Sequence, residues 1–219
     1  MLEDFAKLVP SDLHTTSGSV FYSGRDAFRA PSAIYVLGLN PGGDPEGQAS
    51  DTVGKHLSFV TNEAPAAWSA YTDESWLGKP PGSARFQRRV RHLLSQLGAD
   101  PRRTPSSNLI FARSRRISTL EGGVSAHEEE CWGFHEAVIQ RLAVRMIVCL
   151  GVSTGVAVRR RTAADQLVAQ FREKNQRGWT SSVHFNGSGL SVASLTHPSI
   201  ADWTSEPCDP SEMLQRHLI

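Results

Sequence analysis

Short apolar runs alternate with amphipathic segments along this chain, and the alternation restricts the fold more than any other feature. Three runs of strand-forming residues occupy positions 33–39, 107–112 and 145–151. Segments with apolar side chains at helical spacing occupy positions 83–98, 125–143 and 153–174. Strand–helix alternation of this kind predicts a mainly parallel sheet that is covered by helices.

The expected fold class is therefore α/β, a three-layer α/β/α sandwich around a central, mainly parallel four-stranded sheet. Residues 183–195 are expected to form a hairpin that leads into the last strand. Ser125 is a predicted N-cap, with Glu128 completing a capping box, and Gly98 is positioned to end the first of the helices above. The length of 219 residues fits one domain, which we expect to span residues 1–219 and to be a monomer.

Composition is typical of soluble globular proteins. Hydrophobic residues make up 39% of the chain and charged residues 21%, and no apolar run is long enough to span a bilayer. The first ten residues lack the apolar core of a signal peptide. We therefore expect a cytoplasmic location without membrane contact.

Cysteine and histidine positions argue against a cofactor. The cysteines are odd in number and lack C-x-x-C spacing, which disfavours a disulfide framework and an iron–sulfur site. His127, Cys131 and His135 are spaced four apart and share one helix face, but three ligands on one straight helix do not easily surround a metal. We expect neither a metal nor another cofactor.

Arginines are clustered although the net charge is only +1. The clusters occupy positions 85–92, 113–116 and 159–161. Each could be a solvated helix face, or part of a face that binds a polyanion.

Ligands of parallel sheets bind beyond the carboxyl ends of the strands, and three polar stretches fall there. They are "NPGGD" at 40–44, Asn108 with "ARSRR" at 112–116, and "THPSIADW" at 196–203. "GLNPG" and "HPS" resemble the two signature motifs of the uracil-DNA glycosylase superfamily, nearer its mismatch-specific and single-strand-selective branches. Their order and spacing also match, and the resemblance covers about Ser32 to Trp203.

This resemblance implies a monofunctional DNA glycosylase that flips a nucleotide into a pocket and hydrolyses the bond between base and sugar. Asn40 would orient water at the sugar carbon, although it could instead only cap the turn. His197 would donate a hydrogen bond to the base oxygen where negative charge develops. Because an amide cannot be a general base, stabilisation of the leaving group should contribute most of the catalysis.

The same resemblance implies a base pocket lined by Gly38, Pro41, Gly42, Gly43, Phe59 and Asn108. Asn108 would read the base, uracil or cytosine according to its orientation, or it could begin a strand. Phe59 would stack on the base, or belong to the core. The strictly uracil-specific branch carries a bulky Tyr where this chain has Gly42, so the pocket is expected to accept pyrimidines substituted at ring position 5.

DNA, double- or single-stranded, is the expected partner. Ser199 would hold a phosphate, and Ile200 or Trp203 would fill the gap left by the flipped base, where the family often has Pro-Leu or Gly-Leu. Further phosphate contacts are expected from the helix that bears Arg85, Arg88, Arg89 and Arg91 and from the segment with Arg113, Arg115 and Arg116. Both DNA repair and defence against phage with modified DNA are compatible with this set.

Two other functions compete with a glycosylase. A relative of the same fold could bind flipped bases without excising them, or become cross-linked to DNA; the presence of both Asn40 and His197 favours the enzyme. A nucleotide-binding protein is disfavoured because neither G-x-G-x-x-G nor a phosphate loop occurs in the sequence.

Overall fold

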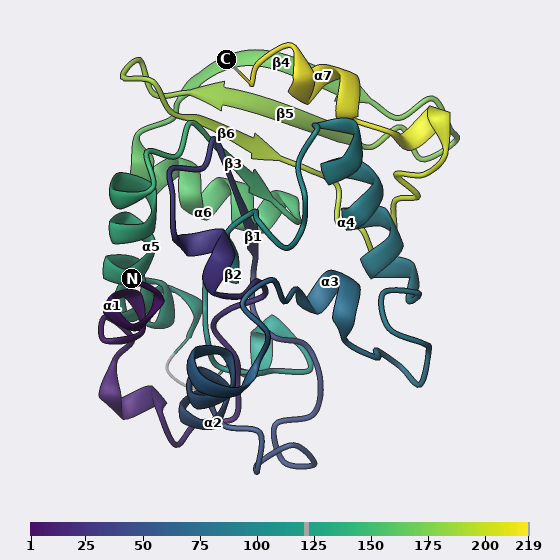
Figure 1. Cartoon of the computed structure of the whole chain (residues 1–219). Coiled ribbons are helices and arrows are strands. Elements are labelled where there is room, and N and C mark those ends of the chain that lie inside the picture. Colours follow the sequence, from purple (N-terminus) through teal and green to yellow (C-terminus); the bar gives the residue numbers. More distant parts are fainter. Residues whose placement is uncertain (121–122, 219) are drawn as a thin grey trace.

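A six-stranded sheet forms the centre of the molecule (Figure 1). The computed structural model describes residues 1–120 and 123–218. Its strands are β1 (Ile34–Gly38), β2 (Ser106–Asn108), β3 (Met146–Cys149), β4 (Gln166–Arg172), β5 (Thr180–Phe185) and β6 (Ser191–Ser194). They lie in the order β2-β1-β3-β6-β5-β4.

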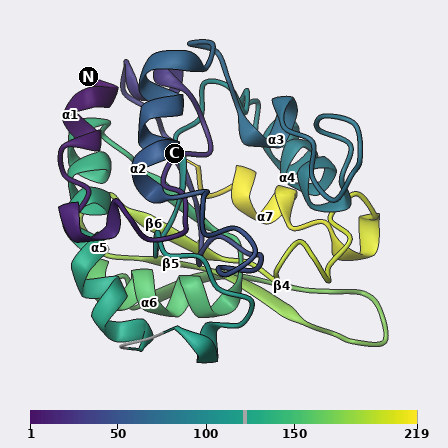
Figure 2. The same ribbon diagram turned by 90° about the horizontal axis from the view of Figure 1, so that it is seen from below.

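The first four strands of this order are parallel, and β5 is antiparallel to both of its neighbours. The predicted α/β fold with a mainly parallel sheet is therefore confirmed, but the predicted number of four strands is wrong. The β4–β5 hairpin supplies the difference and extends the sheet on one side (Figure 2).

Strand β4 replaces the second half of the helix predicted over 153–174. Helix α6 (Val152–Thr162) ends where Ala163 adopts a left-handed conformation, with φ 52°. Beyond it, Val168, Ala169 and Phe171 pack on the core. Branched and aromatic residues suit a half-buried strand surface, so packing against β5 overrides the helical spacing.

Helices cover both faces of the sheet (Figures 1 and 2). One core joins the sheet to α1 (Leu2–Ala6), α2 (Val53–Ser58), α5 (Val124–Arg141) and α6. The other joins it to α3 (Ala70–Asp73), α4 (Arg85–Gln96) and α7 (Ser211–Gln215). Short helical turns are η1 (Ser11–Leu13), η2 (Arg25–Phe28), η3 (Phe59–Glu63), η4 (Ile117–Thr119) and η5 (Glu206–Cys208).

Side chains of β1 alternate between these two cores. Tyr35 and Leu37 face the first core, whereas Ile34 and Val36 face the second. Because successive residues of a strand point to opposite faces, a fully apolar strand is what a sheet covered on both sides requires. The three-layer sandwich predicted from the apolar runs is thus observed.

Helix termini agree with the sequence only in part. Helix α4 is followed by Gly98 with φ 67°, as expected for a helix that ends at a glycine. Helix α5 begins after Gly123, so Ser125 lies inside its first turn and the predicted capping box is wrong. Glu128 is buried, and its carboxylate instead accepts a hydrogen bond from Arg160 at 2.7 Å.

The predicted stripe on α5 belongs largely to the core. His135 is fully buried; its Nε2 donates to the carbonyl of Leu109 at 3.1 Å and its Nδ1 accepts from the Tyr35 hydroxyl at 2.8 Å. Burial lowers the pKa of His135 to about 3, so the ring is neutral. The Cys131 thiol is buried as well. Among the described residues, no group of His, Cys, Asp and Glu side chains is arranged to hold a metal.

Within residues 1–120 and 123–218, no helix combines the length and the apolar character needed to cross a membrane.

Candidate functional site

A cleft of ≈ 1150 Å³ opens at the carboxyl ends of the parallel strands. Residues in the segments that follow β1, β3 and β6 line it, as does the last residue of β2. Helix α2, the start of α6 and the connection between α3 and α4 complete its walls. The cleft therefore lies where a parallel sheet is expected to bind its ligand.

Most of the predicted site residues meet in this cleft. Those that line it are Gly38, Asn40, Gly42, Gly43, Phe59, Asn108, Arg113, Arg115, Arg116, His197 and Ser199. Pro41, Arg85, Arg88, Ile200 and Trp203 lie outside its lining. Residues far apart in the sequence are thus brought together by the strand order.

Trp203 is a wrong prediction for the side chain that enters DNA. It has an exposed fraction of 0% and packs in the second core. A side chain that fills a gap in DNA must project from the surface, and this indole does not. Ile200, the other residue predicted for that role, is 50% exposed.

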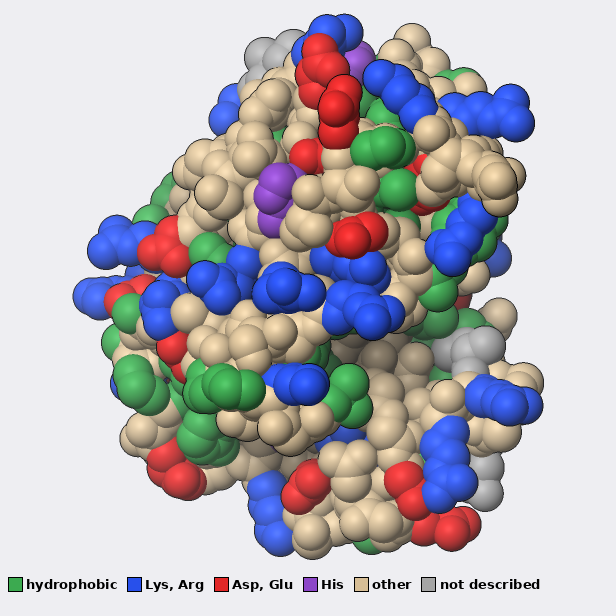
Figure 3. Space-filling model, turned by 90° about the vertical axis from the view of Figure 1, so that its right-hand side faces the viewer, with side chains coloured by type: hydrophobic (Ala, Val, Ile, Leu, Met, Phe, Trp, Pro, Cys, Tyr) green, Lys and Arg blue, Asp and Glu red, His purple; other side chains and the backbone are tan. Residues whose placement is uncertain are grey.

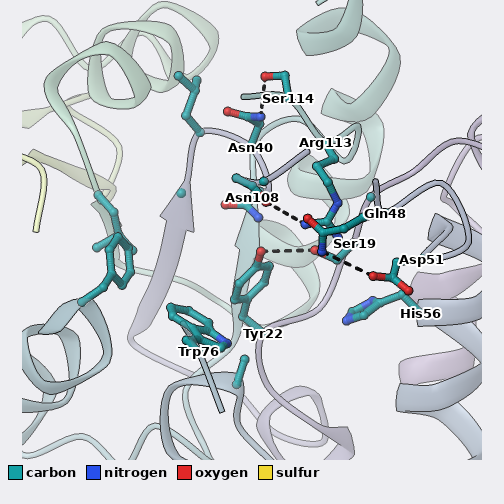
Figure 4. A pocket seen from close by; sticks show the side chains of 18 of the residues that line it. Ser19, Tyr22, Asn40, Gln48, Asp51, His56, Trp76, Asn108, Arg113 and Ser114 are labelled. Carbon is teal, nitrogen blue, oxygen red and sulfur yellow. Dashed lines mark hydrogen bonds between the residues drawn. The ribbon is translucent and has the colours of Figure 1, made fainter. Parts of the chain in front are cut away.

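Asn40 is held in one orientation by the segment that follows β2 (Figure 4). Its Nδ2 donates to the Pro41 carbonyl at 3.0 Å and to the Ser114 hydroxyl at 2.9 Å. Because both bonds use the amide nitrogen, Oδ1 is turned away from Ser114 and remains an acceptor. Asn40 thus stabilises its own turn, as expected of a residue that caps the turn. Its Oδ1 is also available to accept a hydrogen bond.

The "NPGG" loop is fixed by further bonds to the same segment. The Ser114 amide donates to the Pro41 carbonyl at 3.2 Å, and Arg113 Nη1 donates to the Gly42 carbonyl at 2.6 Å. Arg115 forms an ion pair with Asp44. The loop is therefore preformed rather than dependent on a ligand for its shape.

Gly38 makes room for Asn108, its partner in the β1–β2 register. A Cβ atom at Gly38 would lie 2.1 Å from Asn108 Oδ1, so only glycine allows the amide to lie there. Asn108 ends β2 rather than beginning a strand, and it is 6% exposed. Its Nδ2 is buried and has no hydrogen-bond partner of good geometry among the described protein groups, although the amide lies close enough to the Tyr22 hydroxyl to oppose the rise in the pKa of Tyr22 that burial causes. A buried unpaired donor costs ~1–3 kcal/mol, so an acceptor on a ligand is expected at this point.

Gly42 borders open space, whereas Gly43 does not. Among the described residues, no atom lies within 4 Å of where a Cβ at Gly42 would be. At Gly43, with φ 120°, a Cβ would lie 2.2 Å from Gln48 Oε1. The loop after Gly43 therefore fills the space beside the second glycine and leaves the space beside the first one empty.

His197 is a neutral imidazole with a defined tautomer. Its Nδ1 accepts from the Ser199 amide at 3.2 Å and lies 2.7 Å from the Ser199 hydroxyl. The ring proton is therefore on Nε2. Burial lowers the pKa of His197, and the ring packs against the edge of Phe86 at a centroid distance of 5.4 Å.

Aromatic side chains form a part of the cleft that sequence reasoning missed. Tyr22, Tyr71, Trp76 and Phe86 line it, and their rings contact one another. The Trp76 indole N–H donates to Glu74 Oε2 at 2.7 Å, and burial raises the pKa of that carboxyl. Tyr22 and Trp76 stand in irregular segments, where no spacing marks an aromatic residue as a site residue.

Phe59 lies between the cleft and the core, and its role in stacking on a base stays a prediction. It lines the cleft and also packs on the first core, with its ring edge-on to Trp68 at 5.6 Å.

A polar group on and before α2 was also missed, since no motif marks residues 44–58. Gln48 donates to Asp51 Oδ2 at 3.3 Å, and both line the cleft (Figure 4). His56 Nδ1 accepts from the Val20 amide at 3.3 Å, which leaves its proton on Nε2. Burial, followed by the charge of Arg113, lowers the pKa of His56 to about 4. We call Gln48, Asp51 and His56 the α2 group.

The arginine clusters differ in their roles. Arg85 and Arg88 are exposed on α4. The side of the molecule on which α4 lies in Figure 1 carries Lys and Arg side chains that gather beside a hollow (Figure 3). Arg89 in the same cluster is only 7% exposed; it donates to the Pro198 carbonyl at 2.7 Å and to Asp202 at 3.1 Å. It therefore supports the loop that carries His197.

The third cluster lies on α6 and faces carboxylates of α5. Arg160 pairs with Glu128 at 2.7 Å, and Arg161 pairs with Glu129 at 2.6 Å. In contrast, Arg116 is exposed at the cleft, and no ion pair is formed by it within the described parts of the chain. Charge available for a polyanion therefore comes from the first two clusters.

A scan against models of known protein families finds none that matches the chain, and a search of curated proteins finds no relative.

Proposed function

We propose that this chain is a monofunctional DNA glycosylase, which hydrolyses the bond between a flipped pyrimidine base and its deoxyribose. One observation carries the proposal: Asn40, Asn108 and His197, which follow or end three different strands, line one preformed cleft. The resemblance of "GLNPG" and "HPS" to glycosylase motifs gives the proposal its chemistry.

His197 would stabilise the leaving base. Cleavage of the bond gives an oxocarbenium-like sugar and an anionic base, so a donor placed at the base oxygen lowers the barrier. The Nε2–H of His197 is such a donor, because Ser199 occupies the other ring nitrogen. A neutral ring donates this hydrogen bond without a proton having to be transferred first.

Asn40 would position the water that attacks the sugar. Its Oδ1 accepts a hydrogen bond from the water, while its Nδ2 remains bound to Pro41 and Ser114. An amide does not take up the proton. The water therefore adds to the sugar carbon as the base departs, and its proton passes through solvent to the base anion.

Asn108 would bind one edge of the base, and Gly42 would face its ring position 5. The unpaired Nδ2 of Asn108 supports the first role, and the open space beside Gly42 supports the second. We infer that the substrate is a uracil-type pyrimidine or a pyrimidine that carries a substituent at position 5. A repair enzyme and a defence enzyme against phage with modified DNA would both use such a pocket.

A cross-linking DNA-binding module is the second candidate, and Lys55 favours it. This amine is exposed on α2 and lines the same cleft. A primary amine near an abasic sugar can form a Schiff base. Condensation of the Lys55 amine with the C1′ aldehyde of an abasic sugar, with loss of water, would leave the chain covalently attached to DNA, which hydrolysis of the glycosidic bond would not.

The deciding experiment uses single- and double-stranded oligonucleotides that each contain uracil, thymine, 5-hydroxymethylcytosine or a glycosylated hydroxymethylcytosine. A glycosylase should give strand breaks at the modified position only after alkali, and borohydride should trap no adduct. Release of no base from any oligonucleotide would overturn the proposal. A borohydride-trapped adduct on an oligonucleotide with a preformed abasic site, lost in Lys55→Ala and accompanied by no base release from the other oligonucleotides, would establish the cross-linking module instead.

A further inference from the structure

Leu77 is a strained and almost fully exposed apolar residue. Its side chain is 95% exposed, more than that of any other large apolar residue in the described chain. It has φ 55°, followed by Gly78 with φ 67°, and the Lys79 amide donates to the Trp76 carbonyl at 3.0 Å. These values define a tight turn with two left-handed central residues, where Gly and Asn are favoured and a bulky aliphatic side chain is not.

The turn stands at the rim of the cleft on a braced loop. Leu77 lines the cleft together with Glu74 and Trp76, in the connection between α3 and α4 that projects from the body of the molecule (Figure 1). The Gly82 amide donates to the Glu74 carbonyl at 3.2 Å and closes the loop. Gln87 of α4 donates to the same carbonyl at 2.8 Å. The leucine is therefore held outward by a fixed loop.

Neither the conformation nor the exposure of Leu77 is offset by a contact within the described protein. An aliphatic side chain presented in this way gains free energy only when a partner covers it. At the rim of a cleft for a flipped base, the apolar surface available is the base stack itself, from which one base has been removed. Lys79, the last residue of the turn, is exposed, and its ammonium group is placed to contact the phosphates beside that stack.

We propose that Leu77 inserts into the base stack of duplex DNA and fills the gap left by the flipped nucleotide. The proposal rests on the function proposed above and concerns a different loop from the one that carries "HPS". Ile200 of that other loop is less exposed and lies in a helical turn, with its amide bonded to the His197 carbonyl. The backbone of Ile200 is not in the left-handed region, so no strain there has to be offset by a partner.

The first test measures insertion without chemistry. A duplex that contains a tetrahydrofuran abasic analogue next to 2-aminopurine is titrated with the full chain. Wild type should raise the 2-aminopurine fluorescence as the inserted side chain unstacks this base, and Leu77→Ala and Leu77→Gly should lose most of the rise. Leu8→Ala, a change at an exposed leucine in the N-terminal segment, is the matched control and should behave as wild type.

The second test separates insertion from folding and from the base pocket. Leu77→Gly should excise the base from duplex DNA roughly 10- to 100-fold more slowly, because opening a stack without a wedge is costly. Excision from single strands, which have little stack to open, should change less than about twofold. The thermal midpoint of Leu77→Gly should be equal to or above that of wild type, since glycine relieves the left-handed strain.

Three results would overturn the proposal. One is an unchanged fluorescence rise in both variants, and another is an unchanged duplex rate. The third is an equal loss on single and double strands, which would make Leu77 a part of the base pocket. If wild type releases no base from any substrate, the proposed function fails, but the fluorescence test still decides insertion.

Discussion

The two halves of the cleft differ in how they are marked in the sequence. Asn40, Asn108 and His197 form one half, and each lies in or between stretches that resemble glycosylase motifs. The α2 group forms the other half and lies in a segment without any motif. Both halves contain a neutral histidine whose Nδ1 accepts from a backbone amide, Ser199 for His197 and Val20 for His56. Two residues with similar local geometry therefore need not both lie in a recognisable sequence motif.

The "NPGG" loop joins these halves. Asn40 belongs to the first half, and Gly43 packs on Gln48 of the second, with the open space at Gly42 near both. We infer that the first half acts on the bond common to all substrates, while the second half determines which substituents fit. Changes in the first half should then affect every substrate, and changes in the second half should affect substituted bases only.

The largest effect is expected from His197→Ala. Loss of one preorganised donor to a developing anion typically lowers the rate by ~10²–10³, and this loss should be similar for all substrates. DNA affinity should change little, because the proposed partner of the ring is the base rather than a phosphate. Single-turnover rates and binding constants would be compared with those of His14→Ala, a change at an exposed histidine. Nearly unchanged excision would remove His197 from the mechanism.

Gly42→Tyr tests the boundary between the halves. A tyrosine there would fill the space beside ring position 5, so excision of 5-substituted pyrimidines should fall by roughly 10- to 200-fold. Excision of uracil, which leaves that space empty, should change much less. Parallel rate measurements on both kinds of oligonucleotide decide it. If the wild type already excises only unsubstituted uracil, the assignment of substituent selection to the second half of the cleft is wrong.

Acid should destabilise the fold through the second half. The folded pKa of His56 is about 4 and its unfolded value about 6.5, so its stabilising contribution is complete above pH 6.5 and is lost as the pH falls towards 4. In that window its share of the slope is at most ~1.4 kcal/mol per pH unit. Urea unfolding of wild type and His56→Ala at several pH values would measure it. Identical slopes in the two proteins would contradict the assignment.

The smallest effect concerns the arginines that border the cleft. DNA affinity should fall steeply with salt despite the net charge of +1, and Arg116→Ala should reduce the log–log salt slope by about 0.9, the value for one phosphate contact. Arg160→Ala is the matched control, since Arg160 forms an ion pair with Glu128 and does not line the cleft. A slope that is flat in wild type, or lowered equally by both changes, would exclude a phosphate-binding face at the cleft.

Local sequence patterns predicted the parallel strands, most of the helices and the residues that converge at the strand ends. Each of these depends on apolar spacing or on a short motif, both of which are visible in one segment. Strand β4 was not predicted, because its residues form a strand through pairing with β5, which local spacing does not reveal. The burial of Trp203 was missed because a tryptophan after a loop motif has the same local sequence whether it faces solvent or the second core. Leu77 could not be found either, since strain and exposure exist only in three dimensions.

Arg89 connects α4 to the loop that carries His197. One edge of this helix presents Arg85 and Arg88 to the surface, while Arg89 reaches inward to the Pro198 carbonyl and Asp202. The helix is thereby tied to the loop that follows His197 by two hydrogen bonds. In the proposed glycosylase, a strand of DNA bound to the outer arginines would therefore also set the position of the imidazole over the base. Docking along the DNA backbone and alignment of the leaving group would then be coupled through one side chain.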